Sequence, residues 1–454
     1  MFDKTVAALS TPYGRGAIAM IRITGDDAIK IASAVFFPKS GKKLTDISPA
    51  HTVYGDFIYD GSVIDDGMVT VYRAPVSYTG ENMAELCCHG GILVSSLVLR
   101  ALYDAGAVPA AGGEFTKRAF VNGKLRLTAA ESIMDVIDAE TVGALRLAGK
   151  ANRGLLSEEA DRIYNDLKHM IAATYAFIDY PDEDMADMTV SDLIAGVESL
   201  IARAKRLQES YRSGSAVCEG VRTVICGKPN VGKSSLLNML TGEDTAIVTE
   251  IPGTTRDVVT GSVICGQIKL KLSDTAGIRD TDDTVEKIGV MRAKKAMSDA
   301  QLILAVFDGT AEPDDEDLKL IKELKASDAP VIAVINKSDV SDCGAYDGIF
   351  DHTVHVSAKT GEGKEKITGT AEKLFTNGRI DYDEPHLINE RQYGQITSFS
   401  ACCESALSSL RSGQTQDVAC FDLEDALSCI AGLDGKEVKD DIINEIFGKF
   451  CVGK

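Results

Sequence analysis

The feature that most constrains this chain is a glycine-rich segment of eight residues, Gly227-Lys228-Pro229-Asn230-Val231-Gly232-Lys233-Ser234. It follows a β-branched run at Val221–Cys226 and leads into a helical pattern, which is the context that the GxxxxGK[ST] motif requires. In such a loop, backbone N–H groups turn inward around phosphate oxygens at a helix N-terminus, where the partial positive charge favours anions. The segment therefore predicts a nucleoside triphosphate site in an α/β domain.

Two side chains of this segment have individual roles in the prediction. We expect Lys233 to contact the β- and γ-phosphates and the Ser234 hydroxyl to bind Mg²⁺. The nucleotide contacts predicted for the loop and the start of the helix come from Asn230, Val231, Gly232, Lys233, Ser234 and Ser235.

Later segments specify the base as guanine. Asp274-Thr275-Ala276-Gly277 ends a strand that starts at Lys269, where an Asp can hold the metal through water and the Gly277 N–H can face the γ-phosphate. Asn336-Lys337-Ser338-Asp339 ends another strand in an NKxD pattern; the Asp339 carboxylate can accept from both N1–H and the exocyclic amine of guanine, a donor pair that adenine lacks. A third base-contacting loop follows at Ser357-Ala358-Lys359. The further nucleotide contacts are therefore Asp274, Thr275, Ala276, Gly277, Asn336, Lys337, Asp339, Ser357, Ala358 and Lys359.

Between the first two motifs lies a polar loop that we expect to cover the phosphates. Its nucleotide-contacting residues are Thr249, Glu250, Ile251, Pro252, Gly253, Thr254 and Thr255. Thr255 is expected to complete the Mg²⁺ shell and to order the loop only when the γ-phosphate is present.

The residue after Gly277 is Ile278, where Ras-like GTPases place a water-orienting glutamine. An aliphatic side chain cannot hydrogen-bond to water, so hydrolysis needs another polar group and another positive charge. The residues themselves leave the choice open among Arg279, Asp280, Asp282, Asp283 and Glu286.

The apolar pattern predicts a multidomain chain of α/β and α parts. Residues 1–118 read as an α+β domain, 119–216 as the first half of a helical domain, 217–377 as an inserted GTPase domain with a doubly wound, mostly parallel sheet, and 378–454 as the second helical half. Within these parts we expect long helical stretches at Ala129–Ala151 and Leu155–Ile178. The expected GTPase strands are Val221–Cys226, Lys269–Leu272, Leu302–Phe307, Val331–Ile335 and His352–Val356.

Charge and cysteine content exclude several classes of protein. The net charge of −20 argues against a general nucleic-acid coat, because the phosphate backbone would be repelled, so tRNA contact must be local. Eleven cysteines without a CxxC pair indicate reduced thiols rather than a zinc ribbon or a disulfide framework. Since the sequence has no apolar run of about 18 residues, we expect a cytoplasmic protein without a membrane span.

Motifs along the whole chain resemble the MnmE (TrmE) family of bacterial tRNA-modification GTPases. Besides the nucleotide motifs, they are Thr11-Pro12-Tyr13-Gly14-Arg15-Gly16, Gly90-Gly91 after His89, Asn122-Gly123-Lys124-Leu125-Arg126-Leu127 and the terminal Cys451-Val452-Gly453-Lys454. The last matches the C-x-G-K ending of that family.

The resemblance implies a potassium-activated GTPase whose G domains meet face to face in a homodimer. K⁺ would be bound by the Asn230 side chain together with Thr249, Ile251 and Thr254, in the place where other GTPases use an arginine finger. Glu286 matches the water-orienting glutamate of the family.

The resemblance also implies an N-terminal domain that dimerises and binds a 5-formyl- or 5,10-methylene-tetrahydrofolate. The folate site would comprise Arg22, Glu85, Lys124 and Lys454, and Cys451 in the tail is a candidate for a chemical role. The implied function, with an MnmG-type FAD-dependent partner, is installation of a carboxymethylaminomethyl or aminomethyl group at carbon 5 of the wobble uridine of certain tRNAs. The alternative is a regulatory or ribosome-assembly GTPase without folate chemistry.

Overall fold

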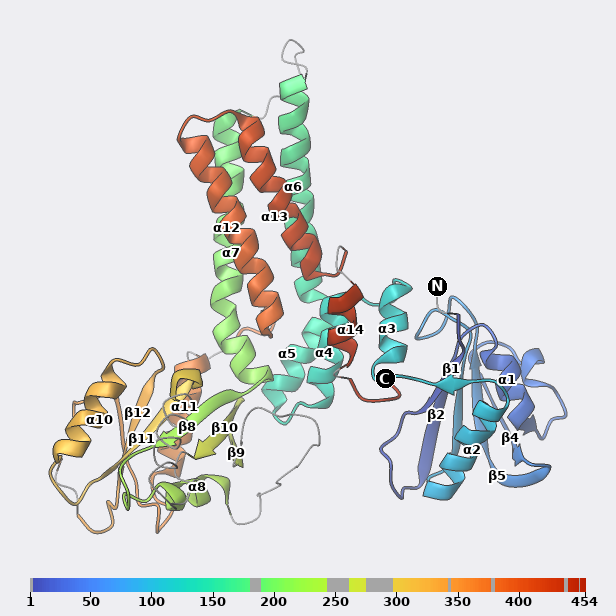
Figure 1. The fold of residues 1–454 in the computed structure, drawn as a ribbon, viewed down its shortest axis with the longest axis horizontal. Helices are drawn as coiled ribbons and strands as arrows, with labels where there is room; N and C mark the ends of the chain where they lie inside the picture. The colour runs from blue at the N-terminus through green and yellow to red at the C-terminus, as the bar shows by residue number, and fades with distance from the viewer. Residues whose placement is uncertain are drawn as a thin grey trace, which may run out of the picture. The chain divides into compact units, whose positions relative to one another are not determined.

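The computed structural model describes residues 3–179, 189–242, 261–274, 297–341, 344–376, 380–436, 440–448 and 450–454. The chain divides into two compact units (Figure 1). Unit 1 comprises residues 1–134, 160–164 and 428–454, and unit 2 comprises residues 135–159 and 165–427. Within the described stretches, no helix combines the length and the apolar composition needed to cross a lipid bilayer.

Unit 1 is built on a seven-stranded mixed sheet in the order β3-β4-β5-β6-β2-β1-β7. The strands are β1 (Val6–Leu9), β2 (Ile18–Thr24), β3 (Phe36–Pro38), β4 (His51–Tyr59), β5 (Ser62–Tyr72), β6 (Met83–His89) and β7 (Val108–Pro109). Its helices are α1 (Ala28–Val35), α2 (Ile92–Asp104), α3 (Glu114–Val121), most of α4 (Leu127–Ile137) and α14 (Asp440–Gly448), with a 3₁₀ turn at Leu44–Asp46.

Helices α1 and α2 cover one face of this sheet. Ile21 and Ile23 of β2 are fully buried in the core that these helices share with the sheet. Because side chains alternate along a strand, Arg22 projects from the opposite face, which these two helices leave uncovered. The N-terminal sheet therefore has the apolar core shared with α1 and α2 on one face and Arg22 on the other.

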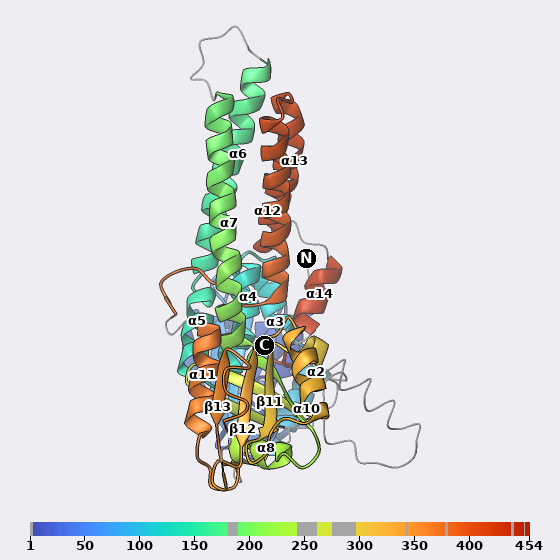
Figure 2. The ribbon, with the colours of Figure 1, turned by 90° about the vertical axis from the view of Figure 1, so that its left-hand side faces the viewer.

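Unit 2 contains a six-stranded sheet in the order β13-β12-β11-β8-β10-β9, parallel except for β9. The strands are β8 (Val221–Cys226), β9 (Gly261–Cys265), β10 (Ile268–Asp274), β11 (Leu302–Asp308), β12 (Val331–Asn336) and β13 (His352–His355). Its helices are α8 (Lys233–Thr241), α10 (Asp315–Lys325) and α11 (Lys364–Thr376), seen beside the strands in Figure 2.

Both faces of this sheet are buried, as the near-continuous apolar runs of its strands require. In β11, Leu304 and Val306 pack in the core on one face, while Ala305 and Phe307 pack in the core beneath α10 on the other. All five predicted strands of the GTPase part are present; β9, an antiparallel edge strand, was not predicted.

The rest of unit 2 is helical. It contains α5 (Val142–Asn152), most of α6 (Leu155–Asp179), α7 (Val190–Cys218), α12 (Glu390–Arg411) and most of α13 (Gln416–Leu433), and the last four run side by side in Figures 1 and 2. The helical stretch expected at Ala129–Ala151 is instead two helices, α4 and α5. The break is at Thr141, whose side chain caps α5 by accepting from Ala144 N (3.0 Å) and donates to Gln267 O (3.0 Å).

Candidate functional site

The P-loop runs from the carboxyl end of β8 to the first residue of α8. Two of its glycines have backbone angles that disfavour other residues, φ +148° at Gly227 and +100° at Gly232. A Cβ at Gly227 would lie 2.4 Å from the Val306 carbonyl oxygen, and one at Gly232 would lie 2.2 Å from Asn336 Nδ2. The motif glycines are therefore needed for both the turn and the close packing around it.

Lys233 and Ser234 open helix α8, as the motif predicts. Lys233 Nζ donates to the carbonyl oxygens of Gly227 (2.9 Å) and Lys228 (2.8 Å), so the ammonium lies over the loop. Ser234 and Ser235 are exposed on the first turn of the helix. A hydroxyl and an ammonium beside the first N–H groups of a helix form an arrangement suited to an anion and its metal.

The predicted guanine-binding residues lie at the carboxyl ends of β12 and β13. Ser357 Oγ donates to Asp339 Oδ1 (2.7 Å), which fixes the orientation of an otherwise exposed carboxylate. Buried Asn336 donates from Nδ2 to Val231 O (2.7 Å) and accepts at Oδ1 from Ala358 N (2.9 Å). One side chain thus joins the P-loop to the loop after β13, and the three segments form one site.

Sequence reasoning missed Asp308, at the end of β11. Its carboxylate accepts from Lys337 Nζ (2.6 Å) and from Thr310 Oγ1 (2.7 Å). Partial burial alone would raise the pKa of Asp308, but the hydrogen bonds from Lys337 and Thr310 outweigh it and lower the pKa. The charged carboxylate of Asp308 holds the Lys337 side chain by this ion pair. The sequence signal that could have identified Asp308 is its position at the end of a predicted strand.

Asp274 is the last residue of β10, and its Cα pairs in register with Ile225 of β8. It therefore reaches the same sheet edge as the P-loop. Three sets of predicted residues lie outside the described part of the chain: Thr275, Ala276 and Gly277; Thr249, Glu250, Ile251, Pro252, Gly253, Thr254 and Thr255; and the segment that contains Glu286.

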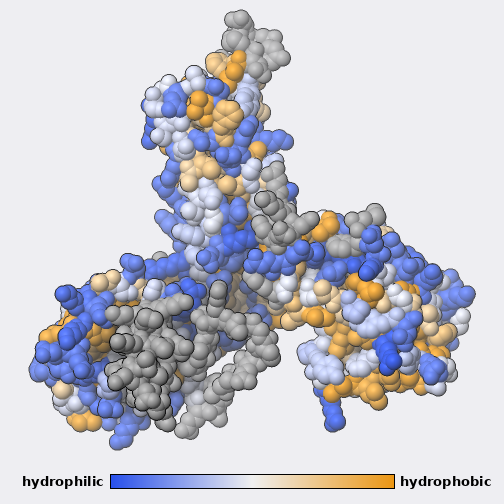
Figure 3. Space-filling view, in the orientation of Figure 1, coloured by the Kyte–Doolittle hydropathy of each residue, from blue (hydrophilic) through white to orange (hydrophobic). Residues whose placement is uncertain are grey.

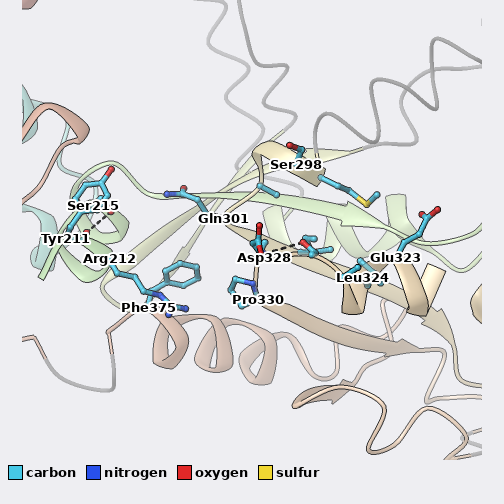
Figure 4. A pocket seen from close by; sticks show the side chains of 16 residues that line it. Tyr211, Arg212, Ser215, Ser298, Gln301, Glu323, Leu324, Asp328, Pro330 and Phe375 are labelled. Atoms are coloured by element: carbon cyan, nitrogen blue, oxygen red, sulfur yellow. Dashed lines mark hydrogen bonds between the residues drawn. The ribbon is translucent and has the colours of Figure 1, made fainter. Parts of the chain in front are cut away.

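A cavity of about 670 Å³ lies at the opposite end of the GTPase sheet. Figure 4 shows its lining, which includes Gln301 and Pro330, just before β11 and β12, and Tyr211 and Arg212 of α7. Ligands of parallel α/β sheets bind outside the carboxyl ends of the strands, whereas this cavity lies at the amino ends. It is therefore separate from the nucleotide site.

The predicted folate residues in unit 1 are partly brought together. Arg22 of β2 pairs with Glu85 of β6 (3.0 Å), and Glu85 also accepts from the Tyr72 hydroxyl (3.2 Å). The Arg22 guanidinium lies 5.6 Å from the centre of the Tyr78 ring. Lys124, after α3, donates instead to Pro75 O (3.2 Å).

The C-terminal tail lies on the N-terminal domain of the same unit. Ser10 Oγ donates to Gly453 O (3.0 Å), Gly113 N donates to Cys451 O (3.2 Å), and Phe115 N donates to Lys454 O (3.0 Å). Gly453 has φ +93°, and a Cβ there would lie 2.4 Å from Leu9 O. This explains why glycine occupies the third position of the C-x-G-K ending, while Cys451 remains exposed.

Two residues that the sequence gave no reason to select connect this tail to Arg22. The Tyr78 hydroxyl lies within hydrogen-bonding distance of Thr116 Oγ1, at 3.0 Å. Thr116 directly follows Phe115, whose backbone N–H donates to the carbonyl oxygen of Lys454. Tyr78 in turn lies beneath Arg22. The tail and the Arg22–Glu85 pair therefore belong to one contiguous region.

Comparisons with known proteins agree with this architecture. The family model described as GTP-binding protein TrmE N-terminus matches residues 5–124, and the MnmE helical domain matches residues 127–451. The chain is 36% identical to the tRNA modification GTPase MnmE of Clostridioides difficile over all of this chain and 99% of that protein. It is 37% identical to that of Carboxydothermus hydrogenoformans over the full length of both. Among solved structures, Era of Aquifex aeolicus is 27% identical over 40% of this chain and 66% of its own, with a TM-score of 0.29.

Proposed function

Because this chain belongs to the MnmE family of tRNA modification GTPases, we propose that it modifies carbon 5 of the wobble uridine of certain tRNAs together with an MnmG-type FAD-dependent protein. The chain is a GTPase that acts in tRNA modification. The group installed is of the carboxymethylaminomethyl or aminomethyl type, and a tetrahydrofolate derivative supplies its one-carbon unit. This takes place in the cytoplasm. GTP hydrolysis moves the G domains and regulates the partner complex rather than performing the carbon chemistry.

The observation that supports the folate part of this proposal is the docking of the C-terminal tail on the N-terminal domain, where Thr116 and Tyr78 connect the tail to the Arg22–Glu85 pair. Arg22 and Lys454 offer cations for the glutamyl carboxylates of a folate, and Glu85 offers an acceptor for its amino-pyrimidinone edge. Lys124 adds a further cation after α3. The exposed thiol of Cys451 lies in the same tail and is the candidate for a chemical role.

The residues at the nucleotide site fit the metal that accompanies GTP. Mg²⁺ prefers oxygen ligands, which the exposed Ser234 hydroxyl supplies on the first turn of α8. Asp274 is the last residue of β10, the strand next to β8, and is proposed to hold the metal through water. Thr255 is the proposed ligand from the loop that covers the phosphates.

A homodimer is part of the proposal. Isolated exposed apolar residues need no explanation, but a group of them marks an interaction surface. The N-terminal domain exposes Ile18 (61%), Met68 (48%) and Val63 (61%) on β2 and β5, and apolar surface gathers on this part of the chain in Figure 3. These residues support dimerisation through the N-terminal domain.

We expect GTP hydrolysis to be faster in KCl than in NaCl at equal ionic strength. The exposed amide of Asn230, with Thr249, Ile251 and Thr254, is proposed to bind K⁺ beside the phosphates, where a positive charge stabilises the transition state. Turnover of the purified full-length protein in the two salts measures the effect. Equal rates would remove the potassium part of the proposal and leave the GTPase assignment intact.

Arg22→Ala should weaken binding of 5-formyltetrahydrofolate by roughly 10- to 150-fold, the range expected for one lost charge-assisted contact. The measurement is calorimetry on the full-length protein without nucleotide, since Lys124 and Lys454 lie outside the first 118 residues. Arg100→Ala, which removes an exposed arginine of α2, is the matched control and should bind normally. Similar affinities for Arg22→Ala and the unaltered protein would contradict the assignment of the site.

Nucleoside analysis of tRNA from cells that lack this protein tests the proposed function as a whole. Loss of the carbon-5 group from wobble uridines, restored by the intact gene, would support it. Normal wobble uridines, together with no folate binding by the purified protein, would favour the ribosome-assembly GTPase.

A further inference from the structure

The second residue of the P-loop motif, Lys228, is held by two carboxylates of helix α10. Its Nζ lies 2.7 Å from Asp314 Oδ2 and 2.7 Å from Asp317 Oδ2. The side chain is 21% exposed, and both of these contacts are made with residues of α10 and its N-cap. Lys228 is therefore engaged in the fold and is not free to bind phosphate, which distinguishes it from Lys233.

The carboxylates that hold Lys228 are themselves fixed. Asp314 is the N-cap of α10 and accepts from the backbone N–H groups of Glu316 and Asp317. Asp317 is fully buried, accepts from the Tyr346 hydroxyl (3.0 Å), and its Oδ1 finds no partner among the described residues. A buried carboxylate with one unsatisfied oxygen depends strongly on its cation.

The ion pair between Lys228 and Asp314 is maintained at physiological pH. The hydrogen bond from Lys228 is the largest cause that lowers the pKa of Asp314, to about 2. In turn, the hydrogen bonds to Asp314 and Asp317 raise the pKa of Lys228 well above its usual range. Lys228 and Asp314 are therefore both charged at physiological pH.

Two positions further along the loop, Asn230 has an unusual backbone conformation. Its φ of +65° is in the left-handed region, which glycine adopts most easily and asparagine adopts more readily than most other residues. On the following side, Val231 is held by the hydrogen bond from buried Asn336 to its carbonyl oxygen. On the preceding side, the backbone carbonyl oxygens of Gly227 and Lys228 accept from Lys233 Nζ, and the Lys228 side chain adds the attachment to α10.

We propose that Lys228 is a positioning residue for GTP hydrolysis: its ion pairs with Asp314 and Asp317 anchor the P-loop so that Asn230 presents its side chain and backbone correctly. This inference rests on the proposed role of Asn230 as a potassium ligand. Lys228 acts through Asn230, without contact with the nucleotide. Its loss should weaken the cation site more than it weakens the binding of guanine.

The test compares GTP hydrolysis by full-length variants over a range of KCl, with choline chloride keeping the ionic strength constant. Lys228→Met should raise the KCl concentration for half-maximal activity about tenfold, the effect of one lost charge-assisted contact. At saturating KCl, kcat should recover to within about twofold, because the catalytic groups are unchanged. Lys228→Arg should restore the cation dependence, since a guanidinium can pair with both carboxylates.

Two further variants separate positioning from a general effect on stability. Asp314→Asn keeps an N-cap side chain but removes one of the two charges, and it should shift the potassium curve in the same direction by less. Lys319→Met removes an exposed lysine of the same helix and should leave the curve unchanged. If Lys228→Met does not fold, the double variant Lys228→Met/Asp317→Asn removes the unpaired buried charge and is measured instead.

A potassium curve for Lys228→Met that coincides with that of the unaltered protein would overturn the proposal, as would an equal shift in Lys319→Met. If the unaltered protein shows no preference for K⁺, the proposed potassium site is wrong. The role of the Lys228 ion pairs in anchoring the P-loop is then tested by measuring the rate of nucleotide release. In that case, Lys228→Met should release a fluorescent GDP analogue several-fold faster than Lys319→Met, and equal release rates would disprove the anchor as well.

Discussion

Replacing Asp339 by asparagine should weaken GTP binding by about 10²-fold or more. The Asp339 carboxylate, oriented by Ser357 Oγ at 2.7 Å, can accept from both N1–H and the exocyclic amine of guanine. Each such charge-assisted bond contributes about 1.5–3 kcal/mol. An asparagine keeps one acceptor, but it places its NH₂ group against the guanine amine, so a donor faces a donor.

The same substitution should favour xanthosine nucleotides, because xanthine has a carbonyl where guanine has the amine. The asparagine NH₂ can donate to that carbonyl while its oxygen still accepts from N1–H. Competition against a fluorescent guanine nucleotide measures both affinities, with Asp315→Asn, at an exposed aspartate of α10, as the control. If Asp339→Asn bound GTP as tightly as the unaltered protein, Asp339 would not be the residue that reads the base.

Replacing Glu286 by alanine should lower kcat by roughly 10²-fold while GTP affinity stays within a few-fold. The reason is that Ile278 cannot orient the attacking water, so another acceptor must do so, and groups that position or deprotonate a nucleophile contribute on this scale. Glu286 lies outside the described residues, so this prediction rests on the sequence and on the family pattern. Single-turnover hydrolysis and equilibrium binding together separate kcat from affinity.

The neighbouring acids Asp280, Asp282 and Asp283 supply the controls for Glu286. Each alanine variant at these positions should hydrolyse GTP at close to the normal rate. Normal hydrolysis by Glu286→Ala, together with loss of activity in one of the three, would transfer the water-orienting role to that aspartate.

The GTPase strands and the ends at which their motifs lie were correctly predicted from the sequence. The segments of β8, β11 and β12 are six or seven residues long and rich in β-branched and other apolar residues, which is typical of buried strands rather than helices. The interruption at Thr141 was not predicted, because the apolar spacing continues through it. Helix α4 ends at Ile137, and the start of α5 is fixed by the Thr141 cap and by the hydrogen bond from Thr141 to Gln267, which is distant in sequence.

The contacts that join the proposed folate residues could not be predicted from the sequence for a similar reason. Arg22 and Glu85 lie opposite each other in the pairing of β2 with β6. The local sequence around either residue does not predict this register. Tyr78 and Thr116 join that pair to the tail, yet they lie on separate segments with no motif of their own. These contacts depend on how the sheet and α3 pack.

The sequence by itself determined the nucleotide site, because phosphate is bound largely by backbone groups of one short segment whose glycines and lysine are adjacent in the chain. The tertiary structure alone decided which distant groups support that segment. Asn336 meets Val231 across 105 residues, Lys228 meets Asp317 across 89, and Ser10 meets Gly453 across 443. Hydrogen bonds and ion pairs require direct contact, so such pairs form only when the fold brings the two residues within a few ångströms. The chemical type of a residue alone does not specify which distant residue will be its partner.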